Sequence, residues 1–169
     1  YSCIHKTLNA KDYGVPQNRK RVIILGNRWD CPSLDLDIKL TPCECTINEL
    51  FSDLPKIKAG TSATEYSGAT SSKVKLMKIK NKNIPLTYQT SRPNTEQDLE
   101  IYKLAVKKWN KNCTRLNYND IPTKLQTHNN KTAFTDRFKV VGGELTASHT
   151  VVAHVAKDGH YYIHPDILQ

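Results

Sequence analysis

The chain of 169 residues carries 25 lysines and arginines against 16 aspartates and glutamates, a formal net charge of +9 at pH 7. This length suits one domain with a modest core, and the charge favours a polyanionic partner, because each cation that neutralises a phosphate releases condensed counterions. The five cysteines form no regular framework and follow no secretory signal. We therefore expect neither disulfides nor a metal site, and we expect a cytoplasmic protein. No apolar run is long enough for a membrane span.

The first predicted element is a short apolar strand over residues 21–26, preceded by a tight turn at Gly14 and Pro16. Between turn and strand stands Gln17-Asn18-Arg19-Lys20-Arg21, which places two guanidinium groups at the entrance of a strand predicted to be buried. Such a fixed cationic pair suits an anionic or carbonyl-bearing ligand. The alternative is a solvated strand edge, where arginine and lysine are common.

The next segment carries a helix-capping signal. Thr46 and Glu49 have the spacing of a capping box, which predicts a short helix from Ile47 to about residue 53. Small and polar residues over 59–73 predict a flexible loop, with a loop that embraces DNA as the other interpretation. The lysine-rich run 73–82 fits a solvated helix or strand face as well as a DNA contact.

The most regular helix is predicted after Pro93. Thr95 is the expected cap, Asp98 follows three residues later, and apolar side chains recur on one face between positions 99 and 109. This pattern predicts a helix over 96–110 whose apolar face belongs to the core. Farther along, β-branched and aromatic residues over 149–156 and 160–164 surround an Asp-Gly pair, which predicts a β-hairpin.

The segment from Tyr13 to Gly26, with its Gln-x-Arg-x-Arg order, resembles the corresponding motif of the DNA (cytosine-5) methyltransferases. Further matches to bacterial members are Leu8-Asn9-Ala10, Asp53-Leu54-Pro55, Phe134 to Val140 and Ser148 to Asp166. The resemblance implies a fragment of a larger enzyme. The Gly-rich loop for S-adenosylmethionine, the Pro-Cys-Gln nucleophile and the Glu-Asn-Val motif of the family do not occur in this sequence, and Cys43 precedes Glu44 rather than Gln.

The resemblance implies an α+β fold in two parts. Residues 1–30 would be a C-terminal piece of the Rossmann-like catalytic domain, and residues 31–169 the target-recognition domain with the return toward the catalytic domain. Twisted strands, irregular loops and two helices are expected. The implied function of the whole enzyme is methylation of a flipped cytosine in a specific duplex sequence, with S-adenosylmethionine as cofactor, in bacterial restriction-modification. This chain alone is expected to bind no cofactor and to transfer no methyl group.

The same resemblance implies roles for individual side chains. Arg21 would contact the flipped cytosine, and Arg19 would brace the site or meet a backbone phosphate. Gln17 would orient the turn, and Thr150 would hold the phosphate beside the flipped nucleotide. Bases would be read by side chains of the variable region that can contact base edges, among them Arg92, Arg115, Lys124, Gln126, His128, Asn129, Asn130 and Arg137. Arg137 could instead pair with Asp136 or Asp98.

The expected partners are duplex DNA, the rest of the catalytic domain and a cognate restriction endonuclease. Two alternatives stay open on the sequence alone. One is a stand-alone basic DNA-binding module, which a Pro-Cys-Gln motif upstream would exclude. The other is an enzyme that clamps a small phosphate or carboxylate with Arg19 and Arg21, which a comparison of duplex DNA with small anions would separate.

Overall fold

The computed structural model describes residues 1–80, 84–133, 135–151, 160 and 162–166. The chain is a mixed α+β structure with small sheets and few helices, as the sequence predicts. Its strands are β1 (Ser2–Asn9), β2 (Gln17–Asn18), β3 (Lys20–Asn27) and β4 (Ser148–His149), and its α-helices are α1 (Ile47–Phe51), α2 (Ser72–Leu76) and α3 (Glu96–Asn112). Single 3₁₀ turns cover Ala10–Tyr13, Tyr118–Asp120 and Thr123–Leu125.

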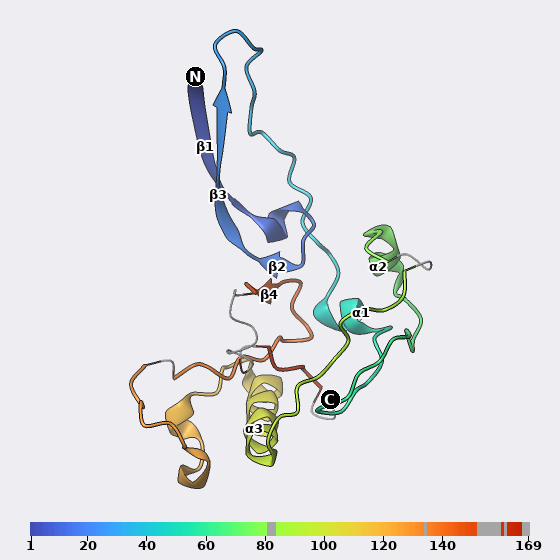
Figure 1. The fold of residues 1–169 in the computed structure, drawn as a ribbon, viewed down its shortest axis with the longest axis vertical. Helices are drawn as coiled ribbons and strands as arrows, with labels where there is room; N and C mark the ends of the chain where they lie inside the picture. Colours follow the sequence, from blue (N-terminus) through green and yellow to red (C-terminus); the bar gives the residue numbers. More distant parts are fainter. Residues whose placement is uncertain (81–83, 134, 152–159, 161, 167–169) are drawn as a thin grey trace.

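Strands β1 and β3 form a long antiparallel hairpin, in which Ser2 pairs with Asn27 and Asn9 with Lys20. The strand predicted over 21–26 is therefore present, whereas its partner β1 was not predicted. The expectation that this strand is buried is wrong, because Val22 and Ile24 are 59% and 66% exposed. The physical reason lies in the arrangement of the elements: the hairpin projects beyond all three helices, so none of them covers its faces (Figure 1).

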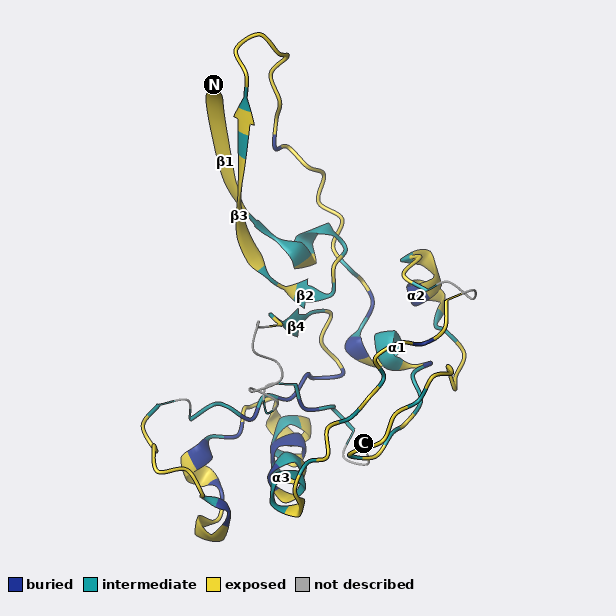
Figure 2. Cartoon of the chain, viewed as in Figure 1, coloured by how far each residue is buried: buried dark blue, intermediate teal, exposed yellow. Residues whose placement is uncertain are grey.

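Helix α3 supplies the main core. Its Thr95 cap is confirmed: the Thr95 hydroxyl accepts from the Asp98 backbone N–H at 3.1 Å, and the Asp98 carboxylate accepts from the Thr95 N–H. The helix ends at Asn112, two residues beyond the predicted end. Its buried stripe, seen in Figure 2, packs in one cluster of apolar side chains: Ile101, Ala105, Val106, Leu116, Tyr118, Ile121, Leu125, Phe138, Val140 and Ile163.

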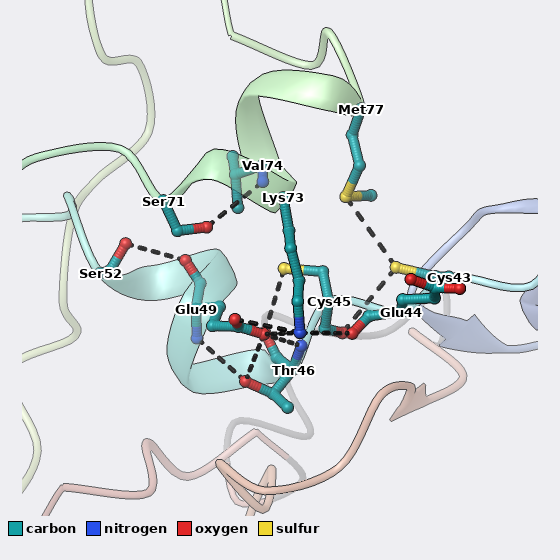
Figure 3. Close-up of polar contacts among 10 residues, drawn as sticks. All are labelled: Cys43, Glu44, Cys45, Thr46, Glu49, Ser52, Ser71, Lys73, Val74 and Met77. Carbon is teal, nitrogen blue, oxygen red and sulfur yellow. Dashed lines mark hydrogen bonds and ion pairs between the residues drawn. The ribbon is translucent and has the colours of Figure 1, made fainter.

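Helices α1 and α2 form a smaller unit (Figure 3). The capping box predicted at Thr46 and Glu49 is present, and α1 ends at Phe51, earlier than the predicted residue 53. Lys73 of α2 lies 3.2 Å from a carboxylate oxygen of Glu49 and joins the two helices. The prediction of two helices is wrong, since α2 adds a third at the end of the predicted loop; the Ser71 hydroxyl caps it and Val74 anchors it in the core.

The segment 140–145 connects this smaller unit to α3. The Leu145 carbonyl accepts from the Ile47 N–H at 2.8 Å, and the Trp109 indole donates to Glu144 at 3.0 Å. A Cβ at Gly142 would overlap the Trp109 ring, so only glycine lets the backbone pass this close. Most of the hairpin predicted over 149–164 falls on residues 152–159 and 161, outside the described part of the chain.

Candidate nucleic-acid interface

Two segments far apart in the sequence meet at a short parallel pair of strands. Gln17 of β2 pairs with Ser148 of β4, and Asn18 pairs with His149. The Ser148 N–H extends the pair by donating to the Pro16 carbonyl at 3.0 Å. Figure 1 shows this pair at the inner end of the long hairpin, where the hairpin joins the rest of the chain. The Gln-x-Arg-x-Arg segment and the start of the family-like segment at Ser148 thus lie side by side.

Side chains beside this strand pair tie the two segments together. The Thr150 hydroxyl donates to the Asn18 carbonyl at 2.8 Å, and the Arg19 guanidinium donates to the Val151 carbonyl at 3.3 Å. At the end of β1, the Asn9 side-chain amide donates to the side-chain oxygen of Asn18 at 2.8 Å. Three site residues proposed from the sequence, Gln17, Arg19 and Thr150, are therefore neighbours in the structure. The contribution of Asn9 was missed, although its position lies in one of the family-like matches.

The turn before β2 has the shape that its glycine and proline predict. Gly14 ends the 3₁₀ turn Ala10–Tyr13 with a φ of 82°, a left-handed conformation that favours glycine. The Asp12 carbonyl accepts from the Thr41 N–H at 2.8 Å, which fixes the turn to the loop after β3. Behind β4, the His149 ring stacks on Tyr162 at 5.0 Å, and the Tyr162 hydroxyl donates to the Thr150 carbonyl. The turn before β2 and the Tyr162 contacts near β4 therefore both support the strand pair.

Arg21 lies apart from these contacts. Its side chain is exposed and donates to the carbonyl of the preceding Lys20 at 2.7 Å, within its own strand β3. Arg19 and Arg21 thus do not contact a common acceptor within the described residues. The structure presents one guanidinium held across the strand pair and a second one open to solvent.

Several of the side chains proposed to read bases have partners within the chain. Arg115 lies 3.2 Å from Asp136, Lys124 lies 3.1 Å from Glu100, and the Gln126 amide donates to the Ile121 carbonyl at 2.9 Å. The two ion pairs are largely exposed, so they contribute little stability. Among the remaining candidates, the Asn130 side chain accepts from the backbone of Thr132 and Ala133, a local turn contact.

Arg137 packs on an aromatic ring. Its guanidinium carbon lies 4.6 Å from the centroid of Tyr118, and it donates to the Ala133 carbonyl at 3.2 Å. The Tyr118 hydroxyl in turn accepts from the His128 backbone N–H at 2.7 Å. Asp136, one of the partners considered for Arg137, lies 3.2 Å from Arg115 and 3.4 Å from Lys139. By contrast, Arg92 and Asn129 are exposed.

A buried ion pair that the sequence did not reveal supports the smaller unit. Asp53 is fully buried, pairs with the Lys80 ammonium group, and accepts from the Thr70 hydroxyl at 2.6 Å. The ammonium also lies 5.1 Å from the centre of the Tyr66 ring. Burial lowers the pKa of Lys80. Asp53 stands in a family-like match, but no sequence spacing indicates that its partner is 27 residues away.

Comparison with known proteins decides the family. A family model described as C-5 cytosine-specific DNA methylase matches residues 1–160. The chain belongs to this family. It is 37% identical to the type II methyltransferase M.Bpa9945I of Bacillus paralicheniformis over 96% of this chain and 38% of that protein. It is also 41% identical to the type II methyltransferase M.MthTI of Methanothermobacter thermautotrophicus, over 40% of this chain and 21% of that protein.

The matches extend over part of each relative only. The type II methyltransferase M.NlaIV of Neisseria lactamica is 48% identical over 30% of this chain and 11% of that protein. This member of the C-5 cytosine-specific DNA methylase family therefore spans less than two fifths of the length of the relatives that it matches. No solved structure matches the chain. In the described residues, no helix combines the length and the apolar character needed to cross a bilayer.

Proposed function

We propose that this chain is the DNA-recognising part of a DNA (cytosine-5) methyltransferase of the restriction-modification type, which positions a flipped cytosine for methylation. Membership of the family and the pairing of β2 with β4 support this proposal. The pairing brings Gln17, Arg19 and Thr150, the residues implied by the resemblance, into one rigid unit. A stand-alone DNA-binding module is not favoured, because the family match runs through nearly the whole chain.

The contacts refine the proposed roles. Thr150 has a single hydroxyl proton and gives it to the Asn18 carbonyl, so in this arrangement Thr150 positions the strand pair. Arg19 uses one N–H for the Val151 carbonyl, and a guanidinium has five. We therefore assign the contact with a backbone phosphate to Arg19, and the contact with the flipped cytosine to the exposed Arg21.

The long hairpin fits a place against the rest of the enzyme. Val22 and Ile24 lie on one face of β3, and Ile23 lies on the other face together with Ile4 of β1; all four are exposed. A strand that is apolar on both faces is typical of a sheet covered on both sides. We propose that residues 1–30 belong to the catalytic domain and residues 31–169 to the target-recognition domain and its return.

S-adenosylmethionine would bind in the remainder of the enzyme and supply the methyl group. The residues of this chain would hold DNA and the extruded base, and the chain alone would transfer no methyl group. Incubation of the isolated chain with labelled S-adenosylmethionine and DNA should leave the DNA unlabelled. Incorporation above a no-protein blank would contradict this division.

The proposed function is tested by separating rate from site choice in the whole enzyme. Arg21→Ala should slow methylation at the same recognition sequence, because Arg21 is assigned to the flipped base and not to readout. Arg92→Ala or Asn129→Ala should relax site choice, since losing a bidentate base contact costs about 1–3 kcal/mol at one position. Sequencing of methylated cytosines measures both effects.

Arg28→Ala is the matched control, because Arg28 lies beyond the outer end of β3 and pairs with Asp30. It should change neither rate nor site choice. The division of roles is wrong if Arg21→Ala alters which sites are methylated, or if the central substitutions slow all sites equally.

A further inference from the structure

Tyr88 combines two unfavourable features at one position. Its side chain is 99% exposed, the most exposed large apolar side chain among the described residues. Its backbone has a φ of 59°, in the left-handed region, which costs a residue other than glycine about 1–2 kcal/mol. Strained and unusually exposed residues that persist in a fold are candidates for a binding role.

The backbone around Tyr88 is held firmly. Thr90 forms a bridge with Ser62, and the Gln89 carbonyl accepts from the Ala63 N–H at 2.9 Å. The Gln89 side chain also donates to the Pro55 carbonyl at 3.3 Å. Two residues before Tyr88, Leu86 is buried. The chain on both sides of Tyr88 is therefore anchored, and the exposed ring projects from a braced turn.

The same braced unit carries exposed cations. Arg92 accepts from the Gly60 N–H through its carbonyl at 2.9 Å, and the Lys58 carbonyl accepts from the Thr61 N–H at 3.0 Å. Both cationic side chains are exposed, and Thr87 and Thr90 beside the ring are exposed as well. A single exposed aromatic ring, on a unit whose other exposed side chains include cations and hydroxyls, differs from the apolar patch typical of a protein-protein contact. It does match nucleic acid, which presents aromatic base faces between phosphates.

We propose that Tyr88 stacks on a DNA base that is left unstacked in the complex, while Lys58 meets a neighbouring phosphate. This inference rests on the proposed function, because it requires DNA as the partner. An anchored backbone loses little further conformational freedom on binding, and the exposed tyrosine ring can stack on any base. Tyr88 would therefore add affinity for distorted DNA without selecting a sequence.

The test compares a fully paired duplex with the same duplex carrying one extrahelical base, both labelled for fluorescence anisotropy with the 169-residue chain. Tyr88→Ala should weaken binding to the bulged duplex about 5- to 100-fold and leave binding to the paired duplex nearly unchanged. Tyr88→Phe keeps the ring and should retain the preference. Trp29→Ala removes another exposed aromatic side chain, in the loop after β3, and should change neither affinity.

A salt series separates stacking from loss of structure. Tyr88 carries no charge, so Tyr88→Ala should lower the affinity for the bulged duplex equally at every salt concentration and keep the slope. If the chain binds duplexes in a salt-dependent way and Tyr88→Ala has no effect on the bulged one, this inference is overturned and the proposed function stands. If the chain binds neither duplex even at low salt, both are overturned.

Discussion

His160 illustrates how burial, as the largest of several causes, shifts the pKa of a side chain. Its ring lies 5.2 Å from Phe138 and 5.8 Å from Tyr102, and its Nδ1 lies 2.7 Å from the Tyr102 hydroxyl. Burial raises the pKa of Tyr102 to about 12. The hydroxyl therefore keeps its proton, and Nδ1 accepts it when the imidazole is neutral and carries its own proton on Nε2. Burial also lowers the pKa of His160, in agreement with that arrangement.

We predict that His160 makes the chain less stable in mild acid. Because the folded pKa lies below the unfolded value of about 6.5, the unfolded state binds the proton more strongly, and stability is lost as pH falls below about 6.5. His160→Phe removes the titration and should flatten this decline. Urea unfolding at about pH 7.5 and pH 5.5 measures it, and His164, whose pKa burial also lowers, is present in both proteins. Equal declines would contradict the prediction.

The ion pair of the buried Asp53 with the partly exposed Lys80 gives a second prediction at this scale. Lys80→Met leaves the Asp53 carboxylate buried without its cation and should destabilise the chain by about 3–5 kcal/mol. The double substitution Asp53→Leu with Lys80→Met should recover much of this loss, because no uncompensated charge remains. Urea unfolding of the three proteins measures both values. A double variant no more stable than Lys80→Met would contradict the prediction, because removal of the carboxylate would then recover no stability.

Among the elements, those specified by local sequence were predictable. Capping boxes and helical periodicity involve residues three or four positions apart, so α1 and α3 follow from their own sequences. The β2–β4 pair was not predicted, because two residues per strand give no periodic signal and the partners stand at opposite ends of the chain. The resemblance named Gln17, Arg19 and Thr150, but only the structure shows that the pairing of β2 with β4 brings them close together.

The passage of segment 140–145 between α1 and α3 also gives a prediction. Gly142→Ala places a methyl group against the Trp109 ring, so either the ring or the backbone must shift. Such overpacking should destabilise the chain by about 1–3 kcal/mol. Gly26→Ala is the matched control, since its nearest neighbour would be the Cys3 sulfur at 3.9 Å. Thermal unfolding compares the two, and equal stability would mean that the segment gives way easily.

Two properties belong to the scale of the whole molecule, its net charge and the projecting hairpin. The chain carries a net charge of +9, and its hairpin projects from the unit that holds the helices (Figure 1). The net charge follows directly from the sequence, and the mixed α+β class was implied by the resemblance to the methyltransferase family. The exposure of the hairpin could not be predicted from the sequence. A strand that is apolar on both faces predicts burial, but the pattern does not say whether this chain or another part of a protein covers it.

The net charge predicts how binding to DNA depends on salt. Binding to duplex DNA should weaken as salt rises, with a log-log slope of about −0.9 for each phosphate contacted, and it should be poor at physiological salt.

Arg19→Ala should make this slope shallower by about 1, because Arg19 is assigned to a phosphate. Arg28→Ala, which removes the same charge at the outer end of the hairpin, should leave the slope unchanged. Fluorescence anisotropy across a salt series measures all three slopes. An affinity that does not change with salt concentration would favour a small anion or a protein as the partner. Equal slopes for Arg19→Ala and Arg28→Ala would mean that the slope reflects the net charge of the chain and not a phosphate contact of Arg19.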